Sequence, residues 1–299
     1  MVKTLKKYTT QYLSDELLEQ LEKYPYVFNP SIVSYLGYFL MTIRVYDTDT
    51  KTIHAHLYTW KEKESFNLLN LTEYFTTITN VEKVADPKLF IMNGNVWGTF
   101  NTGYVQKGEN KVVLFRIKNA QISTYYYCNY NERSRIEKNW AFFMKDNCIY
   151  ALYGLKSGYV LKASSKTLEE GDNLNFVLNS AGVNINFKGY TIGTQLLSLG
   201  DQSYGLIGHK KIEFRGKRIY FGRAFIFTPF EEIPIKKSSP FLIHSLNSLL
   251  GNSFKFNKNL ISCTYFSGIT MRGEEVIISY GINDIDWNII ALKLNKLWE

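Results

Sequence analysis

Ionisable and amide side chains recur at the ends of apolar segments along this 299-residue chain. A carboxyl group in a dry pocket can exchange a proton with a substrate oxygen, and lysine, arginine and histidine side chains can bind an anion such as phosphate. Most strands end in polar residues, so it is the recurrence at matching positions that indicates a site. The recurring pairs are Asn29 and Arg44, Asp86 and Lys88, Lys138 and Asn139, Thr194 and His209, and Asn283 and Asp284.

The segments that carry these pairs are predicted to be β-hairpins. Each joins two apolar runs through a polar or glycine turn, and Asn93–Gly94 has the composition of a type I′ turn. The other predicted turns fall at Gly37, Asp146–Asn147, Gly200–Asp201 and Arg272–Gly273.

The five hairpins begin near residues 31, 86, 140, 193 and 264, and the first four starts are 53 to 55 residues apart. The longer last interval leaves room for an insertion around residues 228–258. A period of this size is typical of β-propellers, whose blades bury their faces only against one another, whereas a β-sandwich predicts no repeat. We therefore predict an all-β fold, a five-bladed β-propeller forming a single domain over residues 1–299.

A short helix is predicted before the first hairpin. Ser14 is a suitable N-cap, and Leu17, Leu18 and Leu21 fall on one helical face. Pro25 then prevents continuation, so a helical segment within about residues 1–26 is expected to precede the strands.

Composition limits the function classes. The chain is 45% hydrophobic and 16% aromatic, which suits a large β-sheet core. The net charge of +8 is scattered, so nucleic-acid binding is not indicated; one basic cluster, from His209 to Arg218, suggests anion binding.

Targeting and metal signals are weak. The three cysteines match no zinc or redox spacing, so neither a metal nor a cofactor is expected. The N-terminal residues lack the apolar core of a signal peptide, and no apolar run is long enough to cross a bilayer. A cytoplasmic protein without a transmembrane segment is expected.

Five short motifs in order resemble those of a known family. They are residues 29–32 (Asn-Pro-Ser-Ile) with Arg44, residues 85–90 (Ala-Asp-Pro-Lys-Leu-Phe), residues 137–140 (Glu-Lys-Asn-Trp), Gly193-Thr194 with His209, and residues 280–284 (Tyr-Gly-Ile-Asn-Asp). The set resembles the signature of the five-bladed mannoside phosphorylases of glycoside hydrolase family 130 and of related propeller-fold mannosyltransferases. The resemblance runs from about residue 27 to residue 290.

The resemblance implies roles for individual residues. Asp86 matches the catalytic acid, and Lys138 and His209 match phosphate-binding positions, which Lys210 and Arg223 could assist. Arg44 and Asp284 match positions that line the sugar pocket, where Lys88, Asn139 and Trp140 would also contact the sugar. The structural alternatives are a turn residue for Asp86, a strand histidine for His209, and surface charges for Lys210 and Arg223.

Some motifs depart from the family pattern. Lys88 replaces an arginine and so loses bidentate geometry, and residues 190–195 replace a Gly-Gly-Thr-Pro segment. Arg133 and Arg135 are both candidates for a further anion-binding arginine. These changes favour a transferase slightly over simple phosphorolysis.

Two function classes remain open. The first is a glycosyltransferase or glycoside phosphorylase that moves a mannose-like unit from a nucleotide sugar or sugar phosphate to a glycan acceptor. The second is a non-catalytic propeller that binds a glycan or a protein partner. Convergence of Asp86, Lys138, His209 and Asp284 on one place would favour the enzyme.

Overall fold

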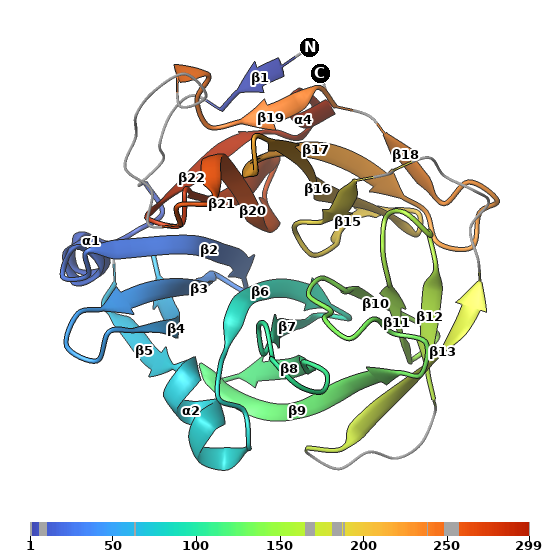
Figure 1. The fold of residues 1–299 in the computed structure, drawn as a ribbon, viewed down its shortest axis with the longest axis horizontal. Coiled ribbons are helices and arrows are strands. Elements are labelled where there is room, and N and C mark those ends of the chain that lie inside the picture. Colours follow the sequence, from blue (N-terminus) through green and yellow to red (C-terminus); the bar gives the residue numbers. More distant parts are fainter. Residues whose placement is uncertain are drawn as a thin grey trace.

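The computed structural model describes residues 2–5, 11–62, 64–164, 171–180, 187, 189–237, 239–247 and 257–298. Nearly all of the regular structure in these ranges is β-strand, and three hydrogen-bonded sheets curl around a common centre (Figure 1). The prediction of an all-β fold is confirmed. No helix in the described ranges is both long and apolar enough to span a membrane.

The predicted N-terminal helix is present as α1 (Asp15–Glu22). Ser14 Oγ accepts a hydrogen bond of 3.2 Å from the Leu17 amide, which satisfies one of the free N–H groups of the first turn. Leu17 and Leu21 are buried and belong to the same core cluster as residues of the first sheet.

The first sheet is a four-stranded antiparallel meander. Its strands are β2 (Tyr26–Tyr35), β3 (Tyr38–Asp47), β4 (Thr52–Lys61) and β5 (Phe66–Asn70), paired in that order. Helix α2 (Leu71–Ile78) follows and packs Leu71 and Phe75 into the core between this sheet and the next.

The second sheet has eight strands made of two antiparallel sets. The first set is β6 (Ala85–Met92), β7 (Asn95–Asn101), β8 (Val112–Lys118) and β9 (Gln121–Tyr130). The second set is β10 (Ala141–Lys145), β11 (Cys148–Leu152), β12 (Val160–Ala163) and β13 (Asn173–Ser180). The last strands of the two sets, β9 and β13, pair in parallel and join them.

The third sheet has ten strands and also contains a parallel junction, between β17 and β20. Its earlier strands are β14 (Tyr190–Ile192), β15 (Leu197–Gly200), β16 (Ser203–Phe214), β17 (Lys217–Phe227), β18 (Ile235–Lys237) and β19 (Phe241–Ile243). The later ones are β20 (Leu260–Arg272), β21 (Glu275–Ile282) and β22 (Asp286–Lys293), followed by α4 (Leu294–Trp298).

The two ends of the chain meet in this third sheet. Strand β1 (Val2–Thr4) pairs in parallel with β19, and Figure 1 shows both termini at the same edge of the molecule.

All five predicted hairpins are present, and their turns use left-handed backbone. Asn93 and Gly94 have φ of +47° and +65°, and Asp146 and Asn147 have +48° and +59°. The fourth turn lies one residue later than predicted, at Asp201–Gln202. Strands β18 and β19 lie in the described part of the predicted 228–258 insertion; residues 238 and 248–256 lie outside the described residues.

Strand β2 packs closely against strands from both other sheets. Ser31 Oγ accepts a hydrogen bond of 2.9 Å from the Leu89 amide of β6, and Ser267 Oγ of β20 donates one of 2.5 Å to the Pro30 carbonyl. The close packing of β20 against β2 requires a glycine at position 268, because a Cβ there would lie 2.8 Å from the Ile32 nitrogen. These contacts fix β2, β6 and β20 side by side.

Candidate functional site

Two β-bulges, each with a residue followed by proline, orient the side chains of Asn29 and Asp86. The β2–β3 register shifts between Phe28 and Ser31, and the β6–β7 register shifts between Ala85 and Lys88. Each bulge contains a residue followed by proline, Asn29 before Pro30 and Asp86 before Pro87. Proline donates no ladder hydrogen bond, so it is accommodated where pairing is already interrupted.

Both residues that precede proline have positive φ, +54° at Asn29 and +48° at Asp86. A non-glycine residue in such a conformation costs on the order of 1–3 kcal/mol and persists only where surrounding contacts hold it. Two hydrogen bonds hold the bulge. Asn101 Nδ2 donates one of 3.1 Å to the Ala85 carbonyl, and Thr42 Oγ1 donates one of 2.9 Å to the Pro87 carbonyl. The bulge therefore aims the Asp86 carboxylate toward β2 and β3.

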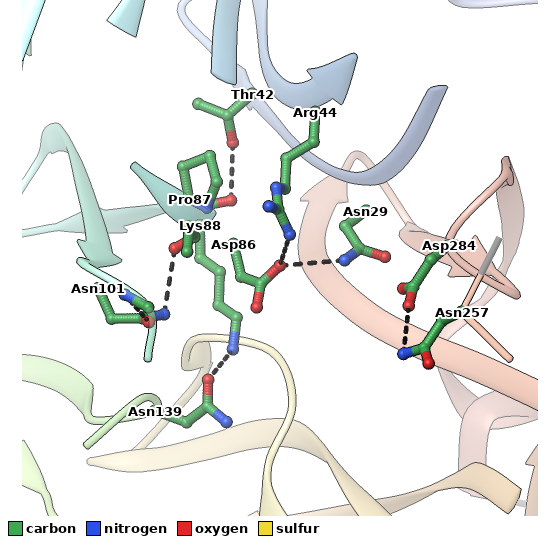
Figure 2. A network of polar contacts seen from close by, with 12 residues as sticks. Asn29, Thr42, Arg44, Asp86, Pro87, Lys88, Asn101, Asn139, Asn257 and Asp284 are labelled. Atoms are coloured by element: carbon green, nitrogen blue, oxygen red, sulfur yellow. Dashed lines mark hydrogen bonds and ion pairs between the residues drawn. The ribbon is translucent and has the colours of Figure 1, made fainter. Parts of the chain in front are cut away.

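The Asp86 carboxylate is held by two side chains from the first sheet (Figure 2). Arg44 Nη1 lies 2.9 Å from Asp86 Oδ1, and Asn29 Nδ2 donates a 3.1 Å hydrogen bond to the same oxygen. Both side chains of the ion pair are only 13% exposed. Among the described residues, both of these side-chain contacts fall on Oδ1.

The pKa of Asp86 is lowered from its ordinary value. Burial raises this pKa, but the positive charges of Arg44, Lys138 and Lys88 and the hydrogen bond from Asn29 outweigh the burial. The carboxyl group is therefore ionised at neutral pH in the free protein.

Lys88, two residues beyond Asp86, is 1% exposed. Its Nζ donates a 2.7 Å hydrogen bond to Asn139 Oδ1 and lies 5.7 Å from the centre of the Tyr265 ring. Burial lowers the pKa of Lys88 to about 7, with Asp86 opposing that shift and the neighbouring Lys138 adding to it.

Asp284 faces Asp86 from the β21–β22 turn (Figure 2). Asn283 and Asp284 both have left-handed backbone, with φ of +55° and +59°, and Asn283 Oδ1 accepts 2.8 Å from the Cys263 amide to fix the turn. Burial and the nearby Asp86 charge raise the pKa of Asp284, partly offset by Arg44, by a 3.4 Å hydrogen bond from Asn257 and by Lys138. Two carboxyl groups are thus close enough to affect one another.

His209 enters the same region from β16 and is 1% exposed. Its ring centre lies 4.4 Å from that of Tyr265, and its Nε2 is buried without a hydrogen-bond partner in the described part of the chain. Gly193 makes room for it, because a Cβ there would lie 2.9 Å from Nε2. Burial and the Lys88 charge lower the pKa of His209 to about 3, so the ring is neutral at pH 7.

Lys138 is exposed, and its charge lowers the pKa values of Asp86, Lys88 and Asp284. Its neighbour Asn139 reaches Lys88 from the loop before β10. The structure therefore brings together seven of the residues singled out in the sequence: Arg44, Asp86, Lys88, Lys138, Asn139, His209 and Asp284.

Trp140 does not join this cluster. It is 1% exposed and packs edge-on against Tyr153 and Phe176 in the hydrophobic core. The prediction that it contacts a sugar is wrong for this arrangement, because other aromatic rings cover its own ring.

Lys210 and Arg223 point away from the cluster. Successive strand residues face opposite sides of a sheet, so Lys210 lies on the other face of β16 from His209, with Nζ 4.8 Å from the Tyr190 ring centre. Arg223 Nε donates 2.5 Å to the Ser239 carbonyl, and its guanidinium lies over Phe241. The structure places neither beside Asp86.

The guanidinium groups of Arg133 and Arg135 donate hydrogen bonds to backbone carbonyls. Arg133 Nη2 contacts the Asn110 carbonyl at 2.6 Å, and Arg135 Nη1 contacts the Gln106 carbonyl at 3.1 Å. Both brace the loop that carries Lys138 and Asn139.

Tyr265 is the site residue that sequence reasoning missed. Its ring lies close to both His209 and Lys88, and burial together with the Asp86 charge raises the Tyr265 pKa well above the ordinary tyrosine value. The hydroxyl therefore stays protonated and can act as a hydrogen-bond donor. One tyrosine among 22 carries no motif; only its place in the fifth hairpin could have indicated it.

The described residues include no group of three or more histidine, cysteine, aspartate or glutamate side chains arranged to hold a metal ion. The arrangement instead offers a carboxylate, a second carboxyl group and several nitrogen donors. These groups suit proton transfer and binding of an oxygen-rich anion.

Comparison with known proteins supports the fold. No protein-family model and no curated protein sequence matches the chain. Among solved structures, the β-1,2-mannobiose phosphorylase of Listeria innocua superposes with a TM-score of 0.58 at 13% identity, covering 91% of this chain and 90% of that one.

Two further structures give similar values. A hypothetical protein from Leishmania major has a TM-score of 0.57 and 18% identity over 90% of this chain and 85% of that chain. A third structure comes from glycoside hydrolase family 130, a family of mannoside phosphorylases that contains hydrolases of β-1,2 mannosidic linkages in Candida mannan. It has a TM-score of 0.57 and 12% identity, and the match covers 91% of this chain and 85% of that chain. The neighbours thus include family 130 proteins, as the sequence resemblance predicted, and at these identities the likeness is one of fold.

Proposed function

We propose that this protein transfers a mannose-like glycosyl unit, as a glycosyltransferase or a glycoside phosphorylase, with Asp86 as the general acid/base. The observation that carries the proposal is the ionised Asp86 carboxylate, which is surrounded by Arg44, Lys88 and Lys138. The Asp86 backbone has a strained left-handed conformation within its bulge. Strained backbone and shifted pKa values each cluster at functional sites.

The proposal includes a five-bladed propeller that forms one domain over residues 1–299. The blades would be β2–β5, β6–β9, β10–β13, β14–β19 and β20–β22. The repeated bulge before proline in the first two sets supports this division, as do the parallel junctions between neighbouring sets. The site residues then come from the inner strands and loops of all five blades.

The reaction would use the ionised form of Asp86 when a glycosyl unit is transferred to an acceptor. An acceptor hydroxyl attacks the anomeric carbon, its proton passes to Asp86, and the bond to the phosphate or diphosphate breaks with the electron pair on the leaving oxygen. In the reverse direction, protonated Asp86 returns the proton to the departing sugar oxygen, directly or through a sugar hydroxyl. One carboxyl group thus serves both directions.

The remaining site residues would bind the two parts of the donor. Lys138 and His209 would bind the phosphate or diphosphate, where developing negative charge needs nitrogen donors. Arg44, Lys88, Asn139 and Asp284 would contact sugar hydroxyls, for which a mixture of donors and acceptors is suited. The mannosidic substrates named for the structural neighbours favour a mannose-like sugar.

The donors proposed here, nucleotide sugars and sugar phosphates, are intracellular metabolites. We therefore include a cytoplasmic location in the proposal. The partners would be one such donor and a glycan acceptor, with neither nucleic acid nor cofactor required.

A donor and acceptor screen tests this function. The protein is incubated with nucleotide sugars in one set and sugar 1-phosphates in another, each with oligosaccharide acceptors, and thermal shift and product formation are measured. Transfer from a nucleotide sugar would identify a transferase, and turnover of a sugar phosphate a phosphorylase. Glycan binding without product from either set would contradict the enzyme and favour a binding module.

A further inference from the structure

The hairpin tip, residues 210–218 at the end of β16 and the start of β17, projects beyond its neighbouring strands. The two strands stay paired in antiparallel as far as Phe214 and Lys217. Among the described residues, the flanking strands β14 and β20 pair with this hairpin only up to Lys210 and Arg218. Every residue from 211 to 218 is exposed, so the hairpin tip is a two-stranded ribbon in solvent.

The hairpin tip stands on the same face of the molecule as the candidate site. Tyr220 of β17 is the register partner of Cys263, and the Asn283 amide donates a 3.1 Å hydrogen bond to the Cys263 carbonyl. Tyr220 therefore lies level with the β21–β22 turn, which carries Asp284. At a strand rise of roughly 3.3 Å per residue, Gly216 lies about 13 Å beyond that level.

One face of the hairpin tip exposes apolar side chains. Successive strand residues face opposite sides of a sheet, so Ile212 and Phe214 share one face. Their partners on the same face of β17 are Ile219 and Lys217. Ile212 is 43% exposed and Phe214 is 56% exposed, and the guanidinium of Arg215 lies 5.3 Å from the centre of the Phe214 ring. Apolar side chains and basic side chains are thus adjacent on this face.

The hairpin tip is also strongly basic. Its net charge is +4, half of the total of +8 for the chain, and its basic residues are Lys210, Lys211, Arg215, Lys217 and Arg218. Its single acidic residue, Glu213, forms ion pairs with Lys211 and Arg218 on the face opposite the apolar side chains. No ion pair among the described residues includes Arg215 or Lys217, so their charges remain available to an external partner.

We propose that the hairpin tip docks this protein onto an anionic membrane surface, with Ile212 and Phe214 inserted among the lipids. Each lysine or arginine near an anionic lipid surface raises the affinity by about fivefold. Apolar side chains beside these charges add to the affinity when they leave water for the acyl region. A nucleic acid or an acidic glycan would attract the same charges, but neither has an apolar surface that would cover the isoleucines.

Docking through the hairpin tip fixes which face of the molecule meets the membrane. Because the tip extends about 13 Å past the β21–β22 turn, the residues around Asp86 would face the lipid surface without being buried in it. The docking uses none of those residues, so the inference does not depend on the proposed function.

Vesicle co-sedimentation of the intact chain tests the inference. The vesicles consist of phosphatidylcholine alone or of phosphatidylcholine mixed with phosphatidylserine, and the bound fraction is measured at increasing salt. The wild-type protein should bind the mixed vesicles at least about tenfold more strongly than the phosphatidylcholine vesicles. Salt should weaken this binding, because it screens the attraction between the basic side chains and the lipid headgroups.

Matched variants locate the binding surface. Phe214→Ser should lower the affinity for mixed vesicles by about tenfold, because a large apolar side chain no longer leaves water. Lys217→Glu should lower it by about tenfold or more, because it replaces an attraction with a repulsion. The controls are Leu36→Ser and Lys118→Glu, which change exposed residues at turns on the opposite face and should bind as the wild type does.

A tryptophan in the hairpin tip reports insertion directly. The emission of Phe214→Trp should shift to shorter wavelength on mixed vesicles and should be quenched by brominated lipids. Failure of the wild type to bind mixed vesicles, wild-type affinity in both hairpin variants, or an unshifted emission of Phe214→Trp would overturn the inference. None of these results decides the proposed function, which depends on product formation in a donor screen without lipid.

Discussion

At the residue scale, the state of Asp86 is set by the cations around it rather than by its burial. Burial alone would raise the pKa of this carboxyl group, yet the net shift is downward because Arg44, Lys138 and Lys88 are close. Asp284 has a raised pKa, because burial and the Asp86 charge outweigh the lowering by Arg44 and Lys138. The pKa values of the two carboxyl groups are therefore shifted in opposite directions.

Replacing Arg44 tests this division. In Arg44→Gln the Asp86 carboxylate loses its 2.9 Å ion pair, so the pKa of Asp86 should rise. In the proposed mechanism, transfer to an acceptor requires ionised Asp86, so the acidic limb of kcat/KM against pH should move to higher pH. The measurement is the pH–rate profile of both proteins; a limb that stays in place would show that Arg44 does not control Asp86.

Sequence reasoning named most of the residues that meet around Asp86, but it did not predict their burial or protonation. The ordered motifs indicated Asp86, Lys138, His209 and Asp284; three of these lie at or beside strand ends, and His209 lies within β16. The burial of Lys88 depends on β16 and β20, which lie more than 100 residues away in the chain. Trp140 was misassigned because a tryptophan beside a site motif has the same sequence appearance whether it faces the site or the core.

At the element scale, the two bulges before proline are the devices that orient the site. The β2 bulge brings Asn29 against β21 as well as toward Asp86, and this requires Gly281. A Cβ on Gly281 would lie 2.0 Å from Asn29 Oδ1 and 2.8 Å from the Asn29 nitrogen. Because the second contact is with backbone, the added atom cannot be avoided by a rotamer change.

Gly281→Ala should therefore displace the β2 bulge. We expect a loss of about 1–3 kcal/mol in the free energy of unfolding, as for overpacked sites, together with a marked fall in kcat. Denaturant unfolding and turnover are measured on the variant and on Gly154→Ala, where the nearest atom to the new Cβ is 3.8 Å away. Equal stability and activity in both variants would contradict the assigned role of the bulge.

The elements themselves were predictable where local chemistry decides them. The hairpin turns were found because Asn, Asp and Gly tolerate the left-handed backbone that tight turns need, as at Asn93–Gly94. Helix α2 was not found, because its sequence, Leu-Thr-Glu-Tyr-Phe-Thr-Thr-Ile, is rich in residues that favour strands. Its helical state depends on the Asn70 cap and on burying Phe75 between two sheets.

At the scale of the whole molecule, buried neutral histidines should make the fold sensitive to acid. Burial lowers the pKa of His56 and His244 to about 4 and that of His209 to about 3. Unfolding restores the ordinary value of 6.5, so the unfolded chain binds more protons below that pH. These groups therefore contribute stability above pH 6.5 that is lost as the pH falls toward their folded values.

The expected loss is measurable. At about 1.4 kcal/mol per pKa unit, His56 alone removes roughly 3 kcal/mol of unfolding free energy between pH 6.5 and pH 4. Urea unfolding across that range should show a steeper decline in the wild type than in His56→Gln. Parallel curves for the two proteins would mean that His56 is protonated in the folded state without cost.

The central claim, that Asp86 performs glycosyl transfer, is tested most directly by turnover of Asp86→Asn with the donor and acceptor identified for the wild type. Asparagine matches the carboxylate in size and tolerates left-handed backbone, so the variant should remain folded. Loss of general acid/base catalysis should lower kcat by about 10²–10⁴-fold. A folded variant with undiminished turnover would contradict the account.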